Sequence, residues 1–167
     1  KDLISTSTPS IDIQISSNFE RLIYDASKNS DYINEIMNDL KKNKSFTLSE
    51  KVREYIQKYF TSDSANQSEV SEVIKEYFSK YDIILDPHTA VGVACGKKQV
   101  SSEDILVTLA TAHPAKFKET VSNIISTDSF ITDKVKELDT LEESMIVADN
   151  STKAIKDIID KRVLWEY

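Results

Sequence analysis

The chain passes from an apolar run into a helical pattern at Thr111-Ala112-His113-Pro114-Ala115-Lys116-Phe117. The run before it, 105–110, is mostly apolar and predicts a strand. Pro114 occupies the position that proline favours in the first turn of a helix. Open α/β sheets place small-molecule sites at such strand-to-helix corners. The stretch therefore predicts a ligand site that offers a hydroxyl, an imidazole and an ammonium group.

A second corner of the same kind lies earlier in the chain. The apolar residues 83–85 predict a short strand, and Asp86-Pro87 predicts the N-cap and the first-turn proline of a helix. Each corner carries a histidine beside its proline, His88 in one case and His113 in the other. Either imidazole could point into a crevice or simply satisfy an exposed amide at its helix start. Residues 82–127 are predicted to form two β-α units.

The rest of the chain is predicted to be largely helical, except for its first part. In residues 1–17, isoleucines alternate with polar residues, which is the period of an extended strand. Residues 18–81 carry apolar side chains at helical spacing and predict a helical subdomain, in which Thr47 and Glu50 match a capping box. Residues 128–167 predict an acidic tail with weaker helical patterns. Together these segments predict an α/β fold with a largely helical insertion.

The composition argues against several classes of function. A net charge of −7 is unfavourable for a nucleic-acid partner, because binding to phosphates requires a basic face. We expect no membrane partner either, since no apolar run reaches the roughly 18 residues that a spanning helix requires. The single cysteine, Cys95, indicates a reducing cytoplasm, and its apolar surroundings predict a buried thiol without chemical role.

Glycine and histidine are both scarce. The chain has two glycines, Gly92 and Gly96, and so cannot form a glycine-rich phosphate loop. With two histidines it also lacks the residues for a multi-histidine metal cage, and we expect no metal site. The missing loop and the absence of a starting methionine suggest a fragment of a larger protein.

Three stretches of the chain resemble signatures of the threonine synthase family. Residues 111–117 match the signature TAHPAKF, and residues 86–92 match DPHTAVG. Residues 10–21 are similar to the segment usually seen as S-M-D-I-x-V-S-S-N-F-E-R-L. The three matches occur in the family's order, and the resemblance covers about 5–125 and fades after about Asp128.

This resemblance implies the C-terminal part of a fold-type-II enzyme that uses pyridoxal phosphate (PLP), with a tryptophan-synthase-beta-like architecture. The family converts O-phospho-L-homoserine and water into L-threonine and phosphate. Its Schiff-base lysine lies in an S-F-K-D-type motif, and neither that motif nor the glycine-rich phosphate cup is present here. We therefore expect no catalytic residue in this chain, a missing N-terminal half as its partner, and little or no activity or PLP binding by the chain alone.

The resemblance also implies roles for individual residues. Thr111 matches the residue whose hydroxyl bonds the pyridine nitrogen of PLP, and a neutral hydroxyl leaves that nitrogen largely unprotonated. His88, His113 and Lys116 match positions near the cofactor. Asn18 also matches a position near the site, although a helix N-cap would explain it equally well.

Two other functions stay open at this stage. One is a threonine-synthase-like phospho-lyase that acts on another small amino-phosphate. The other is a non-catalytic binding module, which should expose an apolar patch and self-associate.

Overall fold

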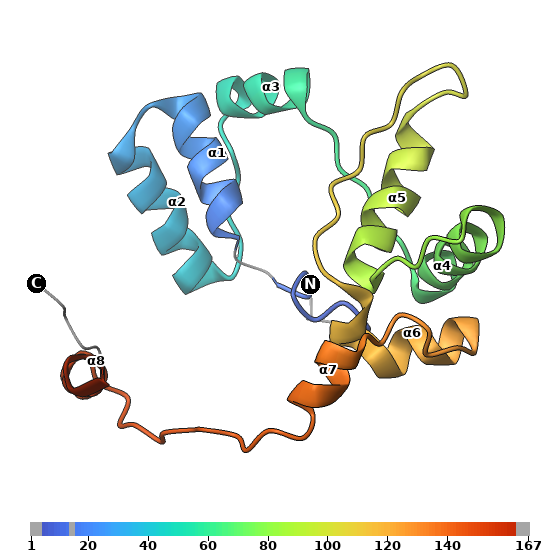
Figure 1. Ribbon diagram of the computed structural model, residues 1–167. Helices are drawn as coiled ribbons and strands as arrows, with labels where there is room; N and C mark the ends of the chain where they lie inside the picture. The colour runs from blue at the N-terminus through green and yellow to red at the C-terminus, as the bar shows by residue number, and fades with distance from the viewer. Residues whose placement is uncertain (1–4, 14–15, 163–167) are drawn as a thin grey trace, which may run out of the picture. The chain divides into compact units, whose positions relative to one another are not determined.

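The computed structural model describes residues 5–13 and 16–162. The chain divides into two compact units, and the division falls between Ile131 and Thr132. Within the described ranges the regular elements are helices (Figure 1). Their bounds are α1 Ser17–Ser27, α2 Ser30–Asn43, α3 Glu50–Tyr59, α4 Gln67–Tyr81, α5 Pro87–Gln99, the 3-10 helix η1 Pro114–Phe117, α6 Lys118–Ile125, α7 Asp133–Leu138 and α8 Thr152–Arg162.

Helices α1, α2 and α3 share a buried cluster, which we call the α1–α3 core. It consists of Ile23, Ile33, Ile36 and Val52. All four lie on the apolar faces that helical spacing predicted. The capping box predicted at Thr47 is wrong, because α3 begins after Ser49, which makes no side-chain cap bond.

Helices α4 and α5 form a second cluster, the α4–α5 core, to which α6 contributes Ile124 and Ile125. The residues that are buried in it are Val70, Val73, Ile74, Ala90, Val93 and Ala94. A capping box that the sequence analysis overlooked, Asn66 with Glu69, starts α4. Two interhelical ion pairs reinforce the contact, because Nζ of Lys97 lies 2.7 Å from Oε2 of Glu76 and Nζ of Lys98 lies 2.7 Å from Oε1 of Glu69.

The segment 105–110 runs back along α5 (Figure 1). Leu106 and Thr108 face the helix: a β-carbon added at Gly96 would lie 2.7 Å from Cδ1 of Leu106, and one added at Gly92 would lie 3.2 Å from Cγ2 of Thr108. The odd-numbered side chains are exposed, at 91% for Ile105, 78% for Val107 and 78% for Leu109. The segment therefore has one side that is partly covered by α5, where Leu106 is 37% exposed, and one side that is uncovered.

None of the strands predicted by the sequence forms in the part of the chain that is described. Residues 83–85 and 105–110 have no assigned secondary structure, and residues 9–11 form a turn in which Ile11 N donates to Thr8 O at 3.0 Å. Gln14 and Ile15, which belong to the first predicted strand, lie outside the described residues. A strand requires a neighbour for its ladder of hydrogen bonds, and these ranges supply none. The predicted α/β class is thus not confirmed.

Four helices end on non-glycine residues in the left-handed conformation. These are Lys28, Lys44, Asp82 and Ser126, with φ values between 52° and 57°. In each, the backbone N–H donates to a carbonyl of the last turn and so satisfies one of its acceptors. Glycine is the usual residue at such positions, and this chain does not use it there.

Candidate functional site at the start of helix α5

The start of α5 is built around a buried carboxylate, Asp86, which is 2% exposed. Its Oδ1 accepts hydrogen bonds from the backbone N–H groups of His88 at 3.0 Å and Thr89 at 3.3 Å. Its Oδ2 accepts the hydroxyl of Thr89. Asp86 is therefore the predicted N-cap, and Pro87 follows it in the first turn.

The hydroxyl of Thr89 connects this cap to the second corner. Its oxygen accepts the backbone N–H of Thr111 at 3.0 Å, and the two threonine hydroxyl oxygens lie 3.3 Å apart. Thr89 is 4% exposed, whereas Thr111 is exposed. We call Asp86, Thr89 and Thr111 the threonine corner. It joins the exposed residue Thr111 to a buried support.

His88 joins three segments behind this corner. Its side chain is 7% exposed, and Nε2 accepts the backbone N–H of Ser10 at 3.3 Å. Its ring lies against Phe117, with a centroid separation of 4.6 Å. Since Nε2 is an acceptor, the neutral ring carries its hydrogen on Nδ1, which lies 3.4 Å from Oδ1 of Asp86. The three stretches singled out in the sequence thus meet at one imidazole.

The turn that meets His88 is closed by its own hydrogen bonds. Asp12 accepts from the backbone N–H of Thr6 at 2.6 Å and from its hydroxyl at 2.7 Å. Thr8, inside the turn, is 3% exposed. These contacts hold Ser10 so that its N–H points at the imidazole.

His113 and Lys116 lie on the exposed side of the second corner. His113 is the N-cap of η1, and its Nδ1 accepts the backbone N–H of Ala115 at 3.2 Å. The structure therefore shows the amide-satisfying role for this imidazole, while Nε2 is not used in capping. The backbone N–H of Lys116 donates to His113 O at 3.1 Å.

Asn18 lies in the first turn of α1 and accepts a hydrogen bond from Arg21. The N-cap of that helix is Ser16, whose hydroxyl accepts the N–H of Phe19 at 3.4 Å. The explanation of Asn18 as a cap is therefore wrong. Cys95 is half-buried, and burial, followed by the charge of Asp63, raises the pKa of its thiol.

This chain is similar to known proteins in both sequence and structure. A family model described as "Threonine synthase, C-terminal" matches residues 89–159. A threonine synthase of Saccharomyces cerevisiae is 31% identical over 95% of this chain and 36% of its own length. The structure matches a PLP-bound threonine synthase from Brucella melitensis with a TM-score of 0.77 at 32% identity, covering 96% of this chain and 35% of that one. The chain is related to the C-terminal portion of threonine synthases.

The relationship is wider than the three motifs suggested. The family model extends to residue 159, past the point near Asp128 where the resemblance was expected to fade. A threonine synthase of Pseudomonas aeruginosa is 36% identical over 72% of the chain and 26% of its own length. The chain spans about one third of the length of the threonine synthases it matches most fully.

The threonine-synthase signatures contain two residues whose importance the sequence analysis missed. Asp86 was predicted as a cap only, and Thr89 was not singled out at all. The available signal was their spacing, because an N-cap aspartate can reach a hydroxyl three residues later in the first turn. What the sequence could not indicate is that Thr89 contacts Thr111, 22 residues away.

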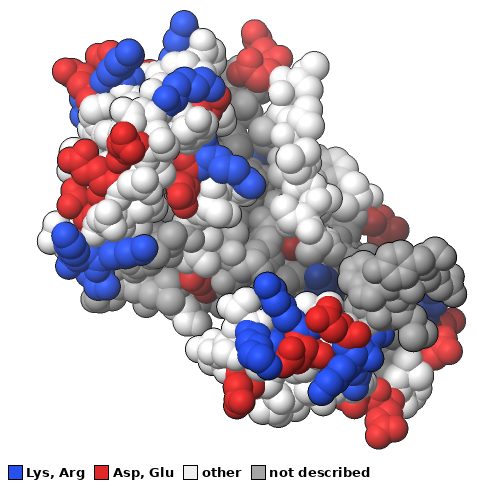
Figure 2. All heavy atoms as spheres, turned by 90° about the vertical axis from the view of Figure 1, so that its left-hand side faces the viewer, with Lys and Arg blue, Asp and Glu red and all other residues white. Residues whose placement is uncertain are grey.

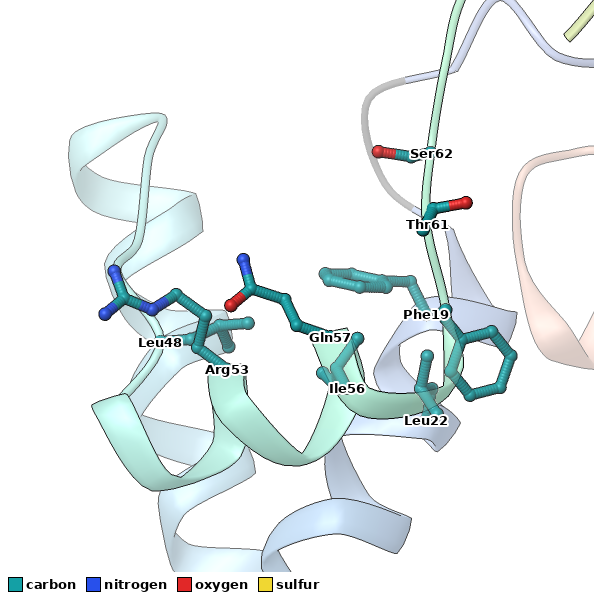
Figure 3. A pocket seen from close by; sticks show the side chains of 9 residues that line it. Phe19, Leu22, Leu48, Arg53, Ile56, Gln57, Thr61 and Ser62 are labelled. Carbon is teal, nitrogen blue, oxygen red and sulfur yellow. The ribbon is translucent and has the colours of Figure 1, made fainter. Parts of the chain in front are cut away.

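A separate hollow lies among the helices of the α1–α3 core (Figure 3). Its volume is about 670 Å³, and Phe19, Leu22, Leu48, Ile56 and Phe60 form most of its lining, with Arg53 and Gln57 at the rim. None of the predicted site residues lines it. The face in Figure 2 mixes acidic and basic side chains, without a large basic patch of the kind that nucleic-acid binding requires.

Proposed function

We propose that this chain forms the C-terminal part of a threonine synthase, which converts O-phospho-L-homoserine and water into L-threonine and phosphate with PLP. The observation that carries the proposal is the threonine corner, whose Thr89 and Thr111 both lie in the stretch that the threonine synthase family model matches. The solved relative from Brucella melitensis is PLP-bound. We further propose that an N-terminal part of the enzyme supplies the lysine that holds the cofactor and the groups that bind its phosphate.

The residues present fit one edge of PLP. The pyridine nitrogen is a single polar atom on an otherwise apolar edge, and one hydroxyl is a suitable partner for it. Thr111 offers such a hydroxyl: it is exposed, it carries no charge, and Thr89 anchors its backbone. When bound, PLP supplies the electron sink for the reaction.

The chain's own residues would position and surround that edge. We propose that the Thr111 hydroxyl orients the ring by donating to its nitrogen. His113, through Nε2, and Lys116 lie on the same exposed corner and are proposed to face the cofactor or its substrate. His88 is proposed to act behind the site, where it keeps Ser10 and Phe117 packed against the start of α5. Asn18 is proposed to lie near the site as well.

We also propose that the α/β fold is completed by strands from the rest of the enzyme. The uncovered side of 105–110 supports this, because an extended segment with exposed Ile105, Val107 and Leu109 is suited to burial in a sheet. In this arrangement 82–127 supply β-α units, with 18–81 as a helical insertion and 1–17 as an extended segment of the same domain. Residues 128–167 form the C-terminal tail.

No helix in the described ranges is both long enough and apolar enough to cross a bilayer. We propose a cytoplasmic enzyme without a nucleic-acid partner.

One observation favours a second candidate. A human protein named threonine synthase-like 1 is 28% identical over 93% of this chain and 20% of its own length. The alternative that we propose is a threonine-synthase-like phospho-lyase that acts on another small amino-phosphate. Both candidates use the same corner, and they differ in substrate.

The deciding experiment uses the full open reading frame that encodes this chain. The purified protein is incubated with O-phospho-L-homoserine, and threonine and phosphate are quantified separately. Equal amounts of threonine and phosphate support threonine synthase. No release from O-phospho-L-homoserine, together with phosphate release from another small amino-phosphate, supports the phospho-lyase. A protein that retains PLP and releases no phosphate from amino-phosphates would overturn both. The 167-residue chain alone is the control and should show little PLP absorbance.

A further inference from the structure

We propose that Thr89 is a positioning residue for Thr111. We also propose that Asp86, by accepting the hydroxyl hydrogen of Thr89, makes the Thr89 oxygen an acceptor toward Thr111. The inference rests on the proposed function, because Thr111 is the residue assigned to the ring nitrogen of PLP. It concerns two residues behind the cofactor edge rather than a group that touches it.

The hydrogen bonds of the corner assign a direction to each partner. A threonine hydroxyl has one hydrogen to donate and two lone pairs to accept with. The hydrogen of Thr89 goes to Oδ2 of Asp86, since a carboxylate can only accept. Toward Thr111, the Thr89 oxygen is therefore an acceptor, and it takes the backbone N–H of Thr111 at 3.0 Å.

This direction leaves the hydroxyl hydrogen of Thr111 for a ligand. The two hydroxyl oxygens are 3.3 Å apart, which is long for a hydrogen bond between hydroxyls. Thr89 has no hydrogen left to donate across this gap, so Thr111 is the donor in it. A better acceptor, such as an unprotonated ring nitrogen, can accept that hydrogen instead, because only the long hydroxyl–hydroxyl contact is given up. The backbone bond at 3.0 Å meanwhile keeps Thr111 in place.

The face of α5 that carries Thr89 holds the segment leading to Thr111 as well. Gly92 and Gly96 follow Thr89 by three and seven residues, so all three share one side of the helix. A β-carbon at Gly96 would lie too close to Cδ1 of Leu106, at 2.7 Å, and one at Gly92 would be in tight contact with Cγ2 of Thr108, at 3.2 Å. The segment is thus fitted to the helix at successive contacts, and Thr89 supplies the last one before the site.

The test compares Thr89→Val, which keeps the shape without the hydroxyl, with Thr89→Ser, which keeps the hydroxyl. Amide hydrogen exchange of the chain is followed residue by residue by NMR. In the wild type, we expect the Thr111 amide to exchange at least about tenfold more slowly than those of the exposed neighbours Leu109 and Ala110. Thr89→Val should remove this protection and Thr89→Ser should restore it. A Thr111 amide that exchanges as fast as its neighbours in the wild type would overturn the proposal without any variant.

A second readout follows the cofactor in the full-length enzyme. We expect Thr89→Val to weaken PLP retention by about tenfold and to change the absorption of the bound cofactor, and Thr89→Ser to restore both. If the wild-type enzyme binds PLP and Thr89→Val leaves both retention and absorption unchanged, the positioning role is wrong. If the wild-type enzyme does not bind PLP, the proposed function fails, and the amide measurement still reports on the corner.

Discussion

The α1–α3 core and the α4–α5 core differ in how completely the surrounding helices bury their apolar side chains. Helices α1, α2 and α3 turn regular apolar stripes toward one another and bury them among themselves. Helix α5 has no such stripe: it buries Pro87, His88, Thr89 and Ala90 in its first turn, and its small residues admit the segment 105–110. That segment then leaves one apolar side uncovered.

This difference supports the proposal that the second region contacts the rest of a larger enzyme. A bundle that covers its own stripes can be recognised from periodicity alone and serves mainly as structure. Helix α5 is apolar on more than one side, and an exposed apolar segment lies next to it. Such a surface is suited to burial against another part of a protein. The site residues belong to the second kind of region, where a cofactor and the rest of an enzyme would have to meet.

The largest expected effect comes from deleting buried side chains in each core. Ile74→Ala and Ile23→Ala each remove a side chain that is 0% exposed, and each should lower the free energy of unfolding by about 2–5 kcal/mol. Residue-resolved hydrogen exchange should show that Ile74→Ala loosens α4, α5 and α6 more than α1, α2 and α3. Ile23→Ala should do the reverse. Equal loosening everywhere in both variants would show that the two cores are one cooperative unit.

The cap of α5 should give the next largest effect. Asp86→Ala removes the acceptor of two backbone N–H groups and one hydroxyl, at an expected cost of about 1–2 kcal/mol in a chemical denaturation experiment. Asp86→Asn is the matched control: its amide oxygen can still cap the helix, but its amide nitrogen cannot accept the Thr89 hydroxyl. We expect an intermediate loss. Identical losses in both variants would mean that the cap alone matters and the Thr89 bond does not.

A matched pair in 105–110 tests the uncovered side. Leu106→Asp places a charge against α5 and should cost about 1 kcal/mol or more, whereas Val107→Asp points to solvent and should change stability by no more than about 0.5 kcal/mol. Val107→Asp should also reduce any self-association of the chain in sedimentation experiments. A large destabilisation by Val107→Asp would show that the chain already covers this side.

The smallest effect concerns the ion pairs between α4 and α5. Lys97, and then Lys80, lower the pKa of Glu76 below its usual range by donating to its carboxylate, and Lys98 does the same for the pKa of Glu69. A carboxyl whose pKa is lowered by folding stabilises the fold above about pH 4.5, and this contribution is lost as the pH falls through the lowered pKa. The stability difference between the wild type and Glu76→Gln should therefore shrink between pH 6 and pH 3, as followed by thermal unfolding. A stability difference that stays constant with pH would show that the ion pairs of Glu76 contribute nothing to the stability of the fold.

The helices were the part of the fold that the sequence could predict. Apolar spacing located α1 to α4 and α8, and Asp86-Pro87 and Pro114 marked the starts of α5 and η1. The strands were not recoverable in the same way, because the pattern of 105–110 indicates burial on two sides and the described chain covers one of them. Helix α5 was located by its cap rather than by a stripe.

For the site, the sequence indicated Thr111 and both histidines but not what each does. A motif gives residue types in order, and it does not show that one imidazole is buried among three segments while the other caps an exposed turn. Thr89 was missed for the same reason, since its role depends on a contact between residues far apart in sequence. Such contacts become visible only once the helix and the segment beside it are placed.

This chain places its glycines inside a helix and other residues at left-handed helix ends, which is the reverse of the usual arrangement. The reversal suggests substitutions that would stabilise the protein. Both glycines lie inside α5, where they make room for a neighbouring segment, while Lys28 and Lys44 adopt left-handed conformations that glycine accepts without strain. Lys28→Gly and Lys44→Gly therefore offer added thermal tolerance at helix ends that are remote in sequence from the threonine corner. A laboratory that needs a sturdier protein for crystallisation or for reconstituting the enzyme can begin with these two positions and leave α5 unchanged.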